Sequence, residues 1–138
     1  MKAVVFTEYG SPDVLRLAEV AKPTPKDNEL LVRVRATPVG YGDLTARDFA
    51  HSQFNMPALL YLPARLAFGW NKPKVNILGS ELAGDVESVG KSVTKFKPGD
   101  AVFAYLGMNM GANAEYICIP ENGRSEERRV GKECRSRW

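Results

Sequence analysis

The chain has 138 residues, of which 44% are hydrophobic and 25% are charged. This length leaves room for one domain with one core, and the composition is ordinary for a soluble globular protein. No apolar run approaches the roughly 18 residues of a membrane span, and the N-terminus has no secretory signal. The two cysteines, Cys118 and Cys134, are too few for a disulfide framework or a metal-binding pair. We therefore expect a cytoplasmic protein that does not contact membranes.

The net positive charge of the chain comes entirely from its C-terminal end. The formal net charge is +3 at pH 7. Residues 1–123 contain 13 Lys or Arg and 13 Asp or Glu, whereas residues 124–138 contain 6 and 3. The body of the chain therefore lacks the basic stripe with which proteins bind phosphate backbones, and we expect no nucleic-acid partner.

Short strands separated by turns dominate the predicted secondary structure. Residues 29–37 alternate most clearly, with Val32 and Val34 on one face and arginines on the other. Many short strands between Gly- and Pro-rich turns favour a β-barrel or a β-sandwich. Further strands are expected at residues 2–7, 14–20, 81–89, 101–105 and 114–119, of which 14–20 is predicted to be half-buried.

A turn and a short helix are expected after the clearest strand. Residues 38–48 begin with a turn bounded by glycines and continue into a short helical segment. Asp43 is placed to cap this helix by accepting hydrogen bonds from backbone N–H groups. Asp43 and Arg47 are four residues apart, which is the spacing of an ion pair on one helix face. We expect that pair to be structural.

Residues 49–76 carry many aromatic side chains without a sustained period. A segment of this length is usually functional or mobile, so we expect a lid, or a short helix and a loop, over a pocket. Phe54, Tyr61 and Trp70 either wall an apolar substrate pocket or pack this segment onto the barrel. The only histidine, His51, lies in the same segment and is interpreted as a surface residue.

Gly79, Gly84 and Gly90 occur in one segment that is otherwise rich in apolar and acidic residues. Glycine is favoured where the backbone takes a positive φ or where another backbone comes close. Three glycines inside a helix would weaken it by about 1 kcal/mol each. The segment is therefore predicted to be a bent strand with points of close approach.

This glycine segment resembles a signature of the medium-chain dehydrogenases/reductases. The signature reads Gly-His-Glu-x-x-Gly-x5-Gly, and Gly79, Ser80 and Glu81 stand at its first three positions. Residues 1–6 and 89–102 match other blocks of the same family in the same order. The resemblance is nearest to the zinc-independent quinone oxidoreductase branch. It implies a mostly β fold (β or α+β) with short helices, built as a GroES-like, partly open β-barrel.

The resemblance covers residues 1–121, which are expected to be the N-terminal, substrate-side domain of the family. Residues 122–138 are expected to be a disordered, non-native tail. From residue 124 the tail has no helix or strand period, and it reads as the translation of a common short-read sequencing adapter. We therefore expect the chain to stop before the Rossmann domain in which the family holds most of its cofactor. The fragment by itself is expected to be inactive.

The residues at the family's metal positions do not predict a zinc site. Ser80 stands where zinc-dependent members carry a ligand His, and Gly42 or a neighbour stands in the region of their Cys. Zinc is normally bound by thiolate, imidazole or carboxylate groups rather than by glycine or a serine hydroxyl. Cys118 is the only cysteine before the tail, so the family's four-cysteine zinc lobe is missing as well. We expect no zinc.

Without zinc, the resemblance implies the reduction of an electrophilic quinone, enone or related carbonyl by NAD(P)H, here expected to be NADPH. Negative charge builds on the carbonyl oxygen during hydride transfer, and hydrogen-bond donors aimed at that oxygen are the protein's main contribution. Tyr41 is the candidate catalytic donor, although its position equally suits an aromatic side chain at the barrel rim. Tyr41, Asp43 and Ser80 are the candidate residues on the nicotinamide side of the cofactor.

Arg47 and Glu81 are expected near the cleft in structural roles. Glu81 matches the Glu of the signature, and its carboxylate is expected to bind Arg47 or backbone N–H groups. The expected partner is a small-molecule quinone or enone, with a homodimer only in the full-length parent. Two alternatives are a stand-alone GroES-like binding module, which needs a partner-facing edge, and a fragment of a zinc-dependent alcohol dehydrogenase, which a tightly held zinc would support.

Overall fold

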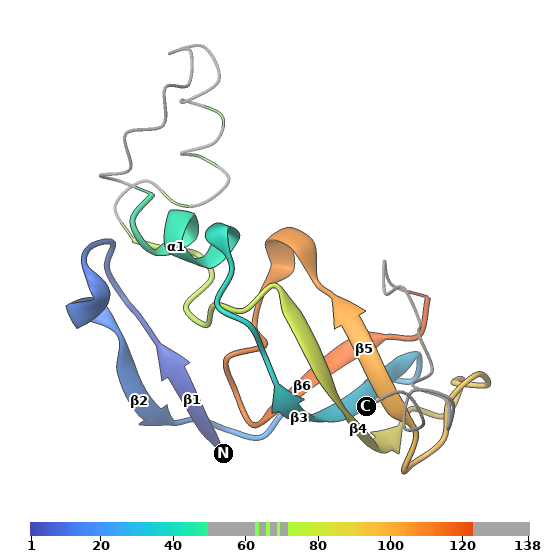
Figure 1. The fold of residues 1–138 in the computed structure, drawn as a ribbon. Coiled ribbons are helices and arrows are strands. Elements are labelled where there is room, and N and C mark those ends of the chain that lie inside the picture. The colour runs from blue at the N-terminus through green and yellow to red at the C-terminus, as the bar shows by residue number, and fades with distance from the viewer. Residues whose placement is uncertain (50–62, 64–65, 67–68, 70–71, 123–138) are drawn as a thin grey trace, which may run out of the picture.

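The computed structural model describes residues 1–49, 63, 66, 69 and 72–122. Its strands alternate with short turns, as the sequence predicts, and an α-helix, Tyr41–Arg47, follows the strand Glu29–Ala36 (Figure 1). The elements in chain order are β1 (Lys2–Val5), a 3-10 helix (Pro12–Val14), β2 (Arg16–Glu19), β3 (Glu29–Ala36), α1 (Tyr41–Arg47), β4 (Glu81–Val89), β5 (Ala101–Tyr105), a 3-10 helix (Gly107–Asn109) and β6 (Tyr116–Pro120).

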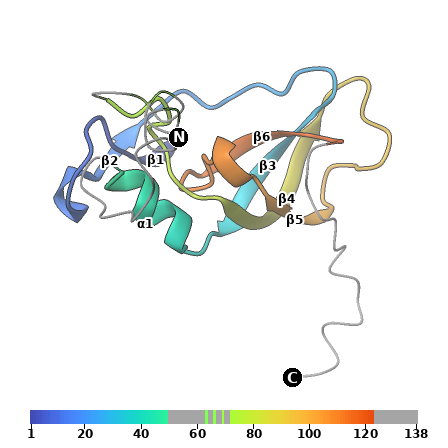
Figure 2. The ribbon, with the colours of Figure 1, turned by 90° about the horizontal axis from the view of Figure 1, so that it is seen from above.

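The strands form two antiparallel sheets. The small sheet contains β1 and β2, and the large sheet has the strand order β5-β4-β3-β6. The sheets lie side by side in Figure 1, and α1 lies nearer the small sheet in Figures 1 and 2. Because β3 and β4 are each paired on both sides, they are the two central strands of the large sheet.

Backbone hydrogen bonds join the small sheet to the rest of the domain. The free edge of β1 faces two loops, where the Val4 N–H donates to the Asn113 carbonyl and the Phe6 N–H donates to the Asn76 carbonyl, both at 2.9 Å. These contacts are isolated bridges rather than continuous strand pairing, so the two sheets do not close into one barrel. The predicted mostly β, partly open fold is confirmed.

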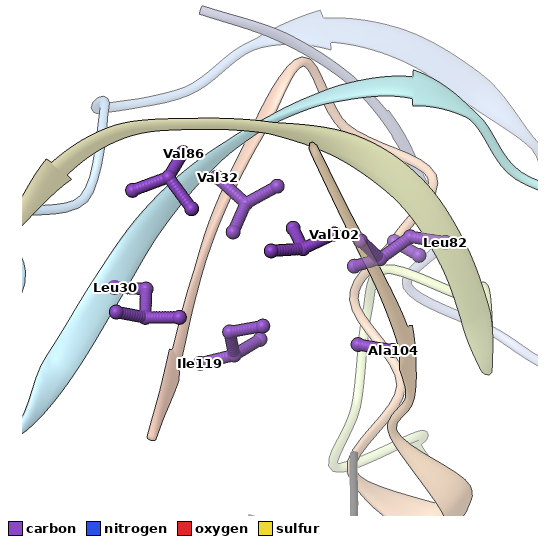
Figure 3. Close-up of a cluster of buried hydrophobic side chains, with 8 residues drawn as sticks. Leu30, Val32, Leu82, Val86, Val102, Ala104 and Ile119 are labelled. Carbon is purple, nitrogen blue, oxygen red and sulfur yellow. The ribbon is translucent and has the colours of Figure 1, made fainter. Parts of the chain in front are cut away.

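The core lies inside the curved large sheet, where side chains from β3, β4, β5 and β6 point toward one another (Figure 3). The alternation of β3 produces this arrangement, because Leu30, Val32 and Val34 face inward while Arg33 and Arg35 face solvent. Arg35 Nε lies 2.6 Å from Asp85 Oδ2 on the outer face. We call the following eight buried residues the barrel core: Leu30, Val32, Leu82, Val86, Val102, Ala104, Ala112 and Ile119.

The glycines of β4 allow other backbone segments to approach closely. A Cβ atom on Gly84 would lie 2.3 Å from the carbonyl oxygen of Arg33 in the neighbouring strand. A Cβ on Gly90 would lie 2.0 Å from the Lys26 carbonyl oxygen. The register between β3 and β4 also shifts twice along their length. The predicted bent strand with points of close approach is therefore confirmed.

Two predicted details differ from the structure. The strand expected at residues 14–20 is limited to β2, and it is largely exposed rather than half-buried, with Leu17 71% exposed. The physical reason is that β2 is an edge strand of a two-stranded sheet, so one of its faces meets solvent. The strand expected at residues 2–7 is shorter in the structure, because β1 covers only Lys2–Val5.

A carboxylate fixes the end of β6. Glu121 is buried, and its Oε1 accepts hydrogen bonds from the backbone N–H groups of Lys95 and Thr94, both at 2.6 Å. These two bonds hold the pKa of Glu121 below its ordinary value. The Glu121 N–H donates to the Asn28 carbonyl at 2.9 Å. Glu121 therefore ties the β4–β5 connection and the loop before β3 to the end of the described chain.

In the described part of the chain, no helix has both the length and the apolar character that crossing a membrane requires. The predicted tail falls outside the described residues from residue 123 onward.

Candidate functional site

Three segments meet beyond the ends of β3 and β4. The Thr37 hydroxyl, just after β3, donates to the Glu81 carbonyl at the start of β4 over 2.9 Å. The loop before β6 bonds to the same region, since the Asn113 N–H donates to the Leu78 carbonyl at 2.9 Å. We call residues 37–43, 78–81 and 111–113 the rim. It unites stretches that are far apart in the sequence.

Asp43 lies at the centre of the rim. Its side chain is buried, with the residue only 2% exposed, and both carboxylate oxygens accept backbone hydrogen bonds. Oδ2 accepts from the Gly40 N–H at 2.8 Å, and Oδ1 accepts from the Gly79 N–H at 2.8 Å. Asp43 is the third residue of α1 and Gly40 is the residue before the helix, so the first bond caps the helix. The predicted capping role is confirmed.

The predicted ion pair between Asp43 and Arg47 is wrong. Within the described residues, no ion pair joins these side chains, and Arg47 Nε instead donates to the Gly10 carbonyl at 3.0 Å. The backbone N–H groups of two glycines occupy the Asp43 oxygens, which leaves Arg47 to anchor α1 to the β1–β2 connection. The Gly10 N–H returns a bond to the Arg47 carbonyl at 3.2 Å.

Gly79 has a backbone that other residues adopt only with strain. Its φ is +98°, and a Cβ atom there would lie 2.7 Å from the Asn113 nitrogen and 2.8 Å from the Ala112 Cβ. The first glycine of the signature is therefore required both by its conformation and by the loop packed against it. Ser80, the next residue, is held by a bond from the Leu106 N–H to its carbonyl at 2.7 Å.

The structure brings the three predicted cofactor-side residues to the same rim. Tyr41 is the first residue of α1 and is 76% exposed, whereas Ser80 is half-buried and Asp43 is buried beneath them. Asp43 bonds to the residue before Tyr41 and to the residue before Ser80. It therefore supports the rim from below, while Tyr41 and Ser80 lie where a ligand could contact them.

Glu81 and Arg47 do not contact each other. Glu81 is half-buried at the start of β4, where it is paired in register with Tyr105. Within the described residues its carboxylate accepts no hydrogen bond and makes no ion pair with Arg47. Among the described residues, the Glu81 carboxylate therefore contacts neither of its two expected partners, Arg47 or backbone N–H groups, and that prediction is wrong there. Its backbone, through the bond from Thr37, is what joins it to the rim.

Sequence reasoning missed two rim residues, Thr37 and Asn113. The Thr37 hydroxyl lies 3.3 Å from Asn113 Oδ1 as well as 2.9 Å from the Glu81 carbonyl oxygen. Its partner Glu81 is 44 positions further along the chain. No local pattern identifies a contact at such a separation, and a threonine before a proline is ordinary at a strand end.

Beside the rim lies a second group of buried apolar residues with a small cavity. The cavity measures about 10 Å³, which is space for the centre of a single water-sized sphere. It is too small for a quinone. The predicted pocket residues Phe54, Tyr61 and Trp70, together with His51, lie outside the described residues. The second group consists of Phe6, Tyr9, Ala46, Phe49, Leu78 and Met110.

A wider groove on the outer face of the large sheet is polar. It has a volume of about 300 Å³ and lies over β3 and β6. Arg35 pairs with Asp85, and Glu115 Oε2 accepts the Lys2 N–H at 2.8 Å. Its remaining lining residues are Arg33, Val34 and Tyr116. This groove lies on the opposite face of the sheet from the barrel core and is not part of the rim.

The described residues do not form a metal-binding set. Among them, no three His, Cys, Asp or Glu side chains come together as ligands. Cys118 is half-buried on β6, and burial raises the pKa of its thiol. The Asp43 oxygens are already occupied by backbone N–H groups. The rim contains no thiolate or imidazole, and Glu81 is its one carboxylate that accepts no hydrogen bond among the described residues. One carboxylate does not fit zinc, which is normally held by three or four such ligands.

Comparisons with known proteins agree with the fold. Residues 26–126 match the family model of the alcohol dehydrogenase GroES-like domain. The chain belongs to this family. The quinone oxidoreductase of Mus musculus is 36% identical over 123 residues, which are 88% of this chain and 32% of that protein.

Solved structures of relatives agree with the sequence matches. Human synaptic vesicle membrane protein VAT-1 homolog-like protein has a TM-score of 0.67 and 34% identity, over 87% of this chain and 32% of that chain. Escherichia coli quinone oxidoreductase complexed with NADPH has a TM-score of 0.65 and 25% identity, over 87% of this chain and 31% of that chain. This GroES-like domain thus belongs to the quinone oxidoreductase-like branch of the medium-chain dehydrogenases/reductases. It spans about a third of the length of these relatives.

Proposed function

We propose that this chain is the substrate-side part of an NAD(P)H-dependent oxidoreductase that reduces a quinone, an enone or a related carbonyl without zinc. The observation that carries the proposal is the rim. There, one buried carboxylate joins the segment of Tyr41 to the family signature segment that contains Ser80. The similarity to quinone oxidoreductases supports the substrate class, and the NADPH complex of the E. coli relative supports the cofactor.

The roles of the rim residues follow from where charge develops. NADPH, when bound, supplies the hydride, so the carbonyl oxygen of the substrate becomes negative during the reaction. Tyr41 donates a hydrogen bond from its hydroxyl to that oxygen, which stabilises the charge. Its large exposure supports this role, because the ring stands clear of the barrel core. Ser80 donates a hydrogen bond from its hydroxyl on the nicotinamide side of the site.

The absence of zinc is supported by the chemistry of the rim. Ser80 occupies the signature position where zinc-dependent relatives carry a ligand histidine, and a serine hydroxyl is a poor zinc ligand. Asp43, the buried carboxylate of the rim, is already bonded to two backbone N–H groups. Substrate activation therefore rests on neutral hydrogen-bond donors, which suits substrates that are electrophilic without a metal.

The same proposal includes the boundaries of the domain. Residues 1–121 form the GroES-like unit and residues 122–138 are a non-native tail. The buried bonds of Glu121 support a domain end at this position. The chain spans about a third of the length of its relatives, and we propose that the cofactor phosphates are bound mainly by the other two thirds of such a protein. The fragment alone therefore lacks turnover, and the parent works in the cytoplasm on a small molecule.

A chimaera with a relative tests this function. Residues 1–121 replace the matching part of mouse quinone oxidoreductase, and NADPH oxidation is measured with 1,4-naphthoquinone. We expect the chimaera to be active. Tyr41→Phe should lower its kcat on the order of a hundredfold with little change in KM, because a hydrogen-bond donor to the transition state is lost. Tyr116→Phe, on the outer face of β6, is the matched control and keeps full activity.

Equal kcat values for the Tyr41→Phe chimaera and its parent would remove Tyr41 from the mechanism. A folded chimaera without quinone reduction would contradict the proposed substrate class. One tightly held zinc per chain, measured by metal analysis, would contradict the zinc-independent mechanism. The 138-residue chain itself is expected to oxidise no NADPH above a protein-free blank.

A further inference from the structure

The connection between β3 and α1 is anchored at both of its ends. At one end the Thr37 hydroxyl bonds to the Glu81 carbonyl, and at the other end Asp43 Oδ1 accepts the Gly79 N–H. Both anchors reach the same short segment at the start of β4. Between them lie Val39 and Tyr41, which are 74% and 76% exposed. The fold thus holds two largely exposed residues at a fixed place.

The Asp43 carboxylate, which anchors the second end of this connection, is buried and has no cationic partner among the described residues. Burying a carboxylate costs several kcal/mol unless hydrogen bonds replace its hydration. Here two backbone N–H groups, at 2.8 Å each, provide that replacement, while Arg47 is turned toward Gly10. A helix cap requires only the bond to Gly40. The second bond, to Gly79, is what joins the helix to β4.

The segment that contains Ser80 cannot move away from Asp43 easily. Gly79 is backed by the loop before β6, because the space for a Cβ atom is filled by Asn113 and Ala112. The Ala112 N–H donates to the Gly79 carbonyl at 3.1 Å. Gly79 is therefore held from both sides, by Asp43 and by the loop. Its position fixes the backbone of Ser80.

We propose that Asp43 is a positioning residue that sets the spacing between Tyr41 and Ser80. One oxygen holds the residue before Tyr41, and the other holds the residue before Ser80. Asp43 is buried and both of its carboxylate oxygens are occupied by backbone N–H groups, so it touches neither substrate nor cofactor in this proposal. This inference rests on the proposed function for the chemical meaning of the two hydroxyls, but the positioning itself is a property of the ligand-free domain.

Amide hydrogen exchange in the 138-residue protein tests the positioning. In Asp43→Ala we expect exchange at Gly40 and Gly79 to accelerate about tenfold or more, because hydrogen bonds to a charged acceptor are lost. Asp43→Asn keeps one acceptor oxygen, so only one of the two amides should accelerate. Asp85→Asn, which removes an exposed carboxylate from the outer face of β4, is the matched control and should leave both amides unchanged.

The pattern of exchange separates positioning from a general contribution to stability. Positioning predicts that the amide of Val32, in the central strand, keeps its protection in all three variants. Acceleration at Val32 equal to that at Gly79 would overturn the inference, and so would unchanged exchange at Gly40 and Gly79 in Asp43→Ala.

A ligand probe separates failure of this inference from failure of the proposed function. On addition of 2-cyclohexenone to the wild-type chain, we expect the amide resonances of Tyr41 and Ser80 to shift. These shifts should shrink in Asp43→Asn and persist in Asp85→Asn. Shifts of the same size in Asp43→Asn would overturn the positioning role. If the wild-type chain shows no shifts, the proposed enone site fails while the exchange result still decides whether Asp43 positions the rim.

Discussion

The barrel core and the rim are neighbours in the fold, but different interactions hold them together. In the barrel core, strands meet through side chains that are almost fully withdrawn from water, such as Leu82 at 1% exposure. At the rim, the segments meet through hydrogen bonds between side chains and backbone: the Thr37 hydroxyl donates to a carbonyl, and the Asp43 carboxylate accepts from two N–H groups. Apolar contacts tolerate small shifts, whereas each hydrogen bond fixes one distance and one direction.

This difference suits the two regions to different tasks. The barrel core supplies most of the stability, because burial of apolar area is the largest favourable contribution to folding. The rim contributes less stability but holds Tyr41 and Ser80 in a defined arrangement. Substitutions in the two regions should therefore differ both in size and in how far their effects spread.

The largest effect is expected from a cavity in the barrel core. Leu82→Ala removes a buried side chain between β3 and β5, and we expect the free energy of unfolding to fall by about 3 kcal/mol. Urea unfolding followed by circular dichroism measures this loss. Leu17→Ala is the matched control, since Leu17 is exposed on β2 and should change stability by less than about 0.5 kcal/mol. Similar losses at the two positions would contradict the assignment of the core.

A smaller loss of stability is expected when the rim glycine Gly79 is replaced. Gly79→Ala forces a residue with a Cβ atom into a positive φ and against the Asn113 backbone, at a cost of about 2 kcal/mol. Gly42→Ala is the control, because no atom lies within 4 Å of its Cβ position and it sits in α1. That change should stabilise the protein by up to about 1 kcal/mol. Thermal or urea unfolding curves measure the stability of both variants. If Gly79→Ala and Gly42→Ala changed the stability in the same direction, the contrast between the two glycine positions would be refuted.

The barrel core was largely predictable from the sequence, because its signal is local. The alternation of residues 29–37 predicted β3 and the inward direction of Val32. The strand expected at residues 101–105 has the same bounds in the structure. The three glycines predicted the bent strand β4. In each case neighbouring residues carry the information, since the side chains of a strand alternate with a period of two.

The rim was only partly predictable, because its contacts are long-range. Resemblance to the family identified Tyr41, Asp43 and Ser80, but it did not show that Asp43 lies beneath the other two. The spacing of Asp43 and Arg47 predicted a local ion pair, but the carboxylate instead accepts bonds from the nearby Gly40 N–H and from the Gly79 N–H, which is 36 positions away. Thr37 has no sequence signal at all, because its bond partner is 44 residues away.

Glu121 shows the same type of long-range backbone bond at the opposite end of the domain, and pH can remove it selectively. Hydrogen bonds from the Lys95 and Thr94 N–H groups lower its pKa from the ordinary value of 4.5. A carboxylate whose pKa is lower in the folded state contributes stability above its unfolded pKa, and this contribution is lost as the pH falls through the folded pKa. Glu121→Gln should therefore melt at a lower temperature than the wild type at pH 7. The difference should be smaller than that for Gly79→Ala and should narrow below about pH 4.5.

Thermal melting of both proteins between pH 7 and pH 3 measures this convergence. Glu8→Gln, which removes an exposed carboxylate from the β1–β2 connection, controls for the change in net charge. If the curves of the wild type and Glu121→Gln stayed parallel down to pH 3, the charge of Glu121 would not be what holds the β4–β5 connection. Convergence would show that a buried carboxylate bonded only to backbone N–H groups stabilises the end of the barrel, by the same kind of bond that orders the rim.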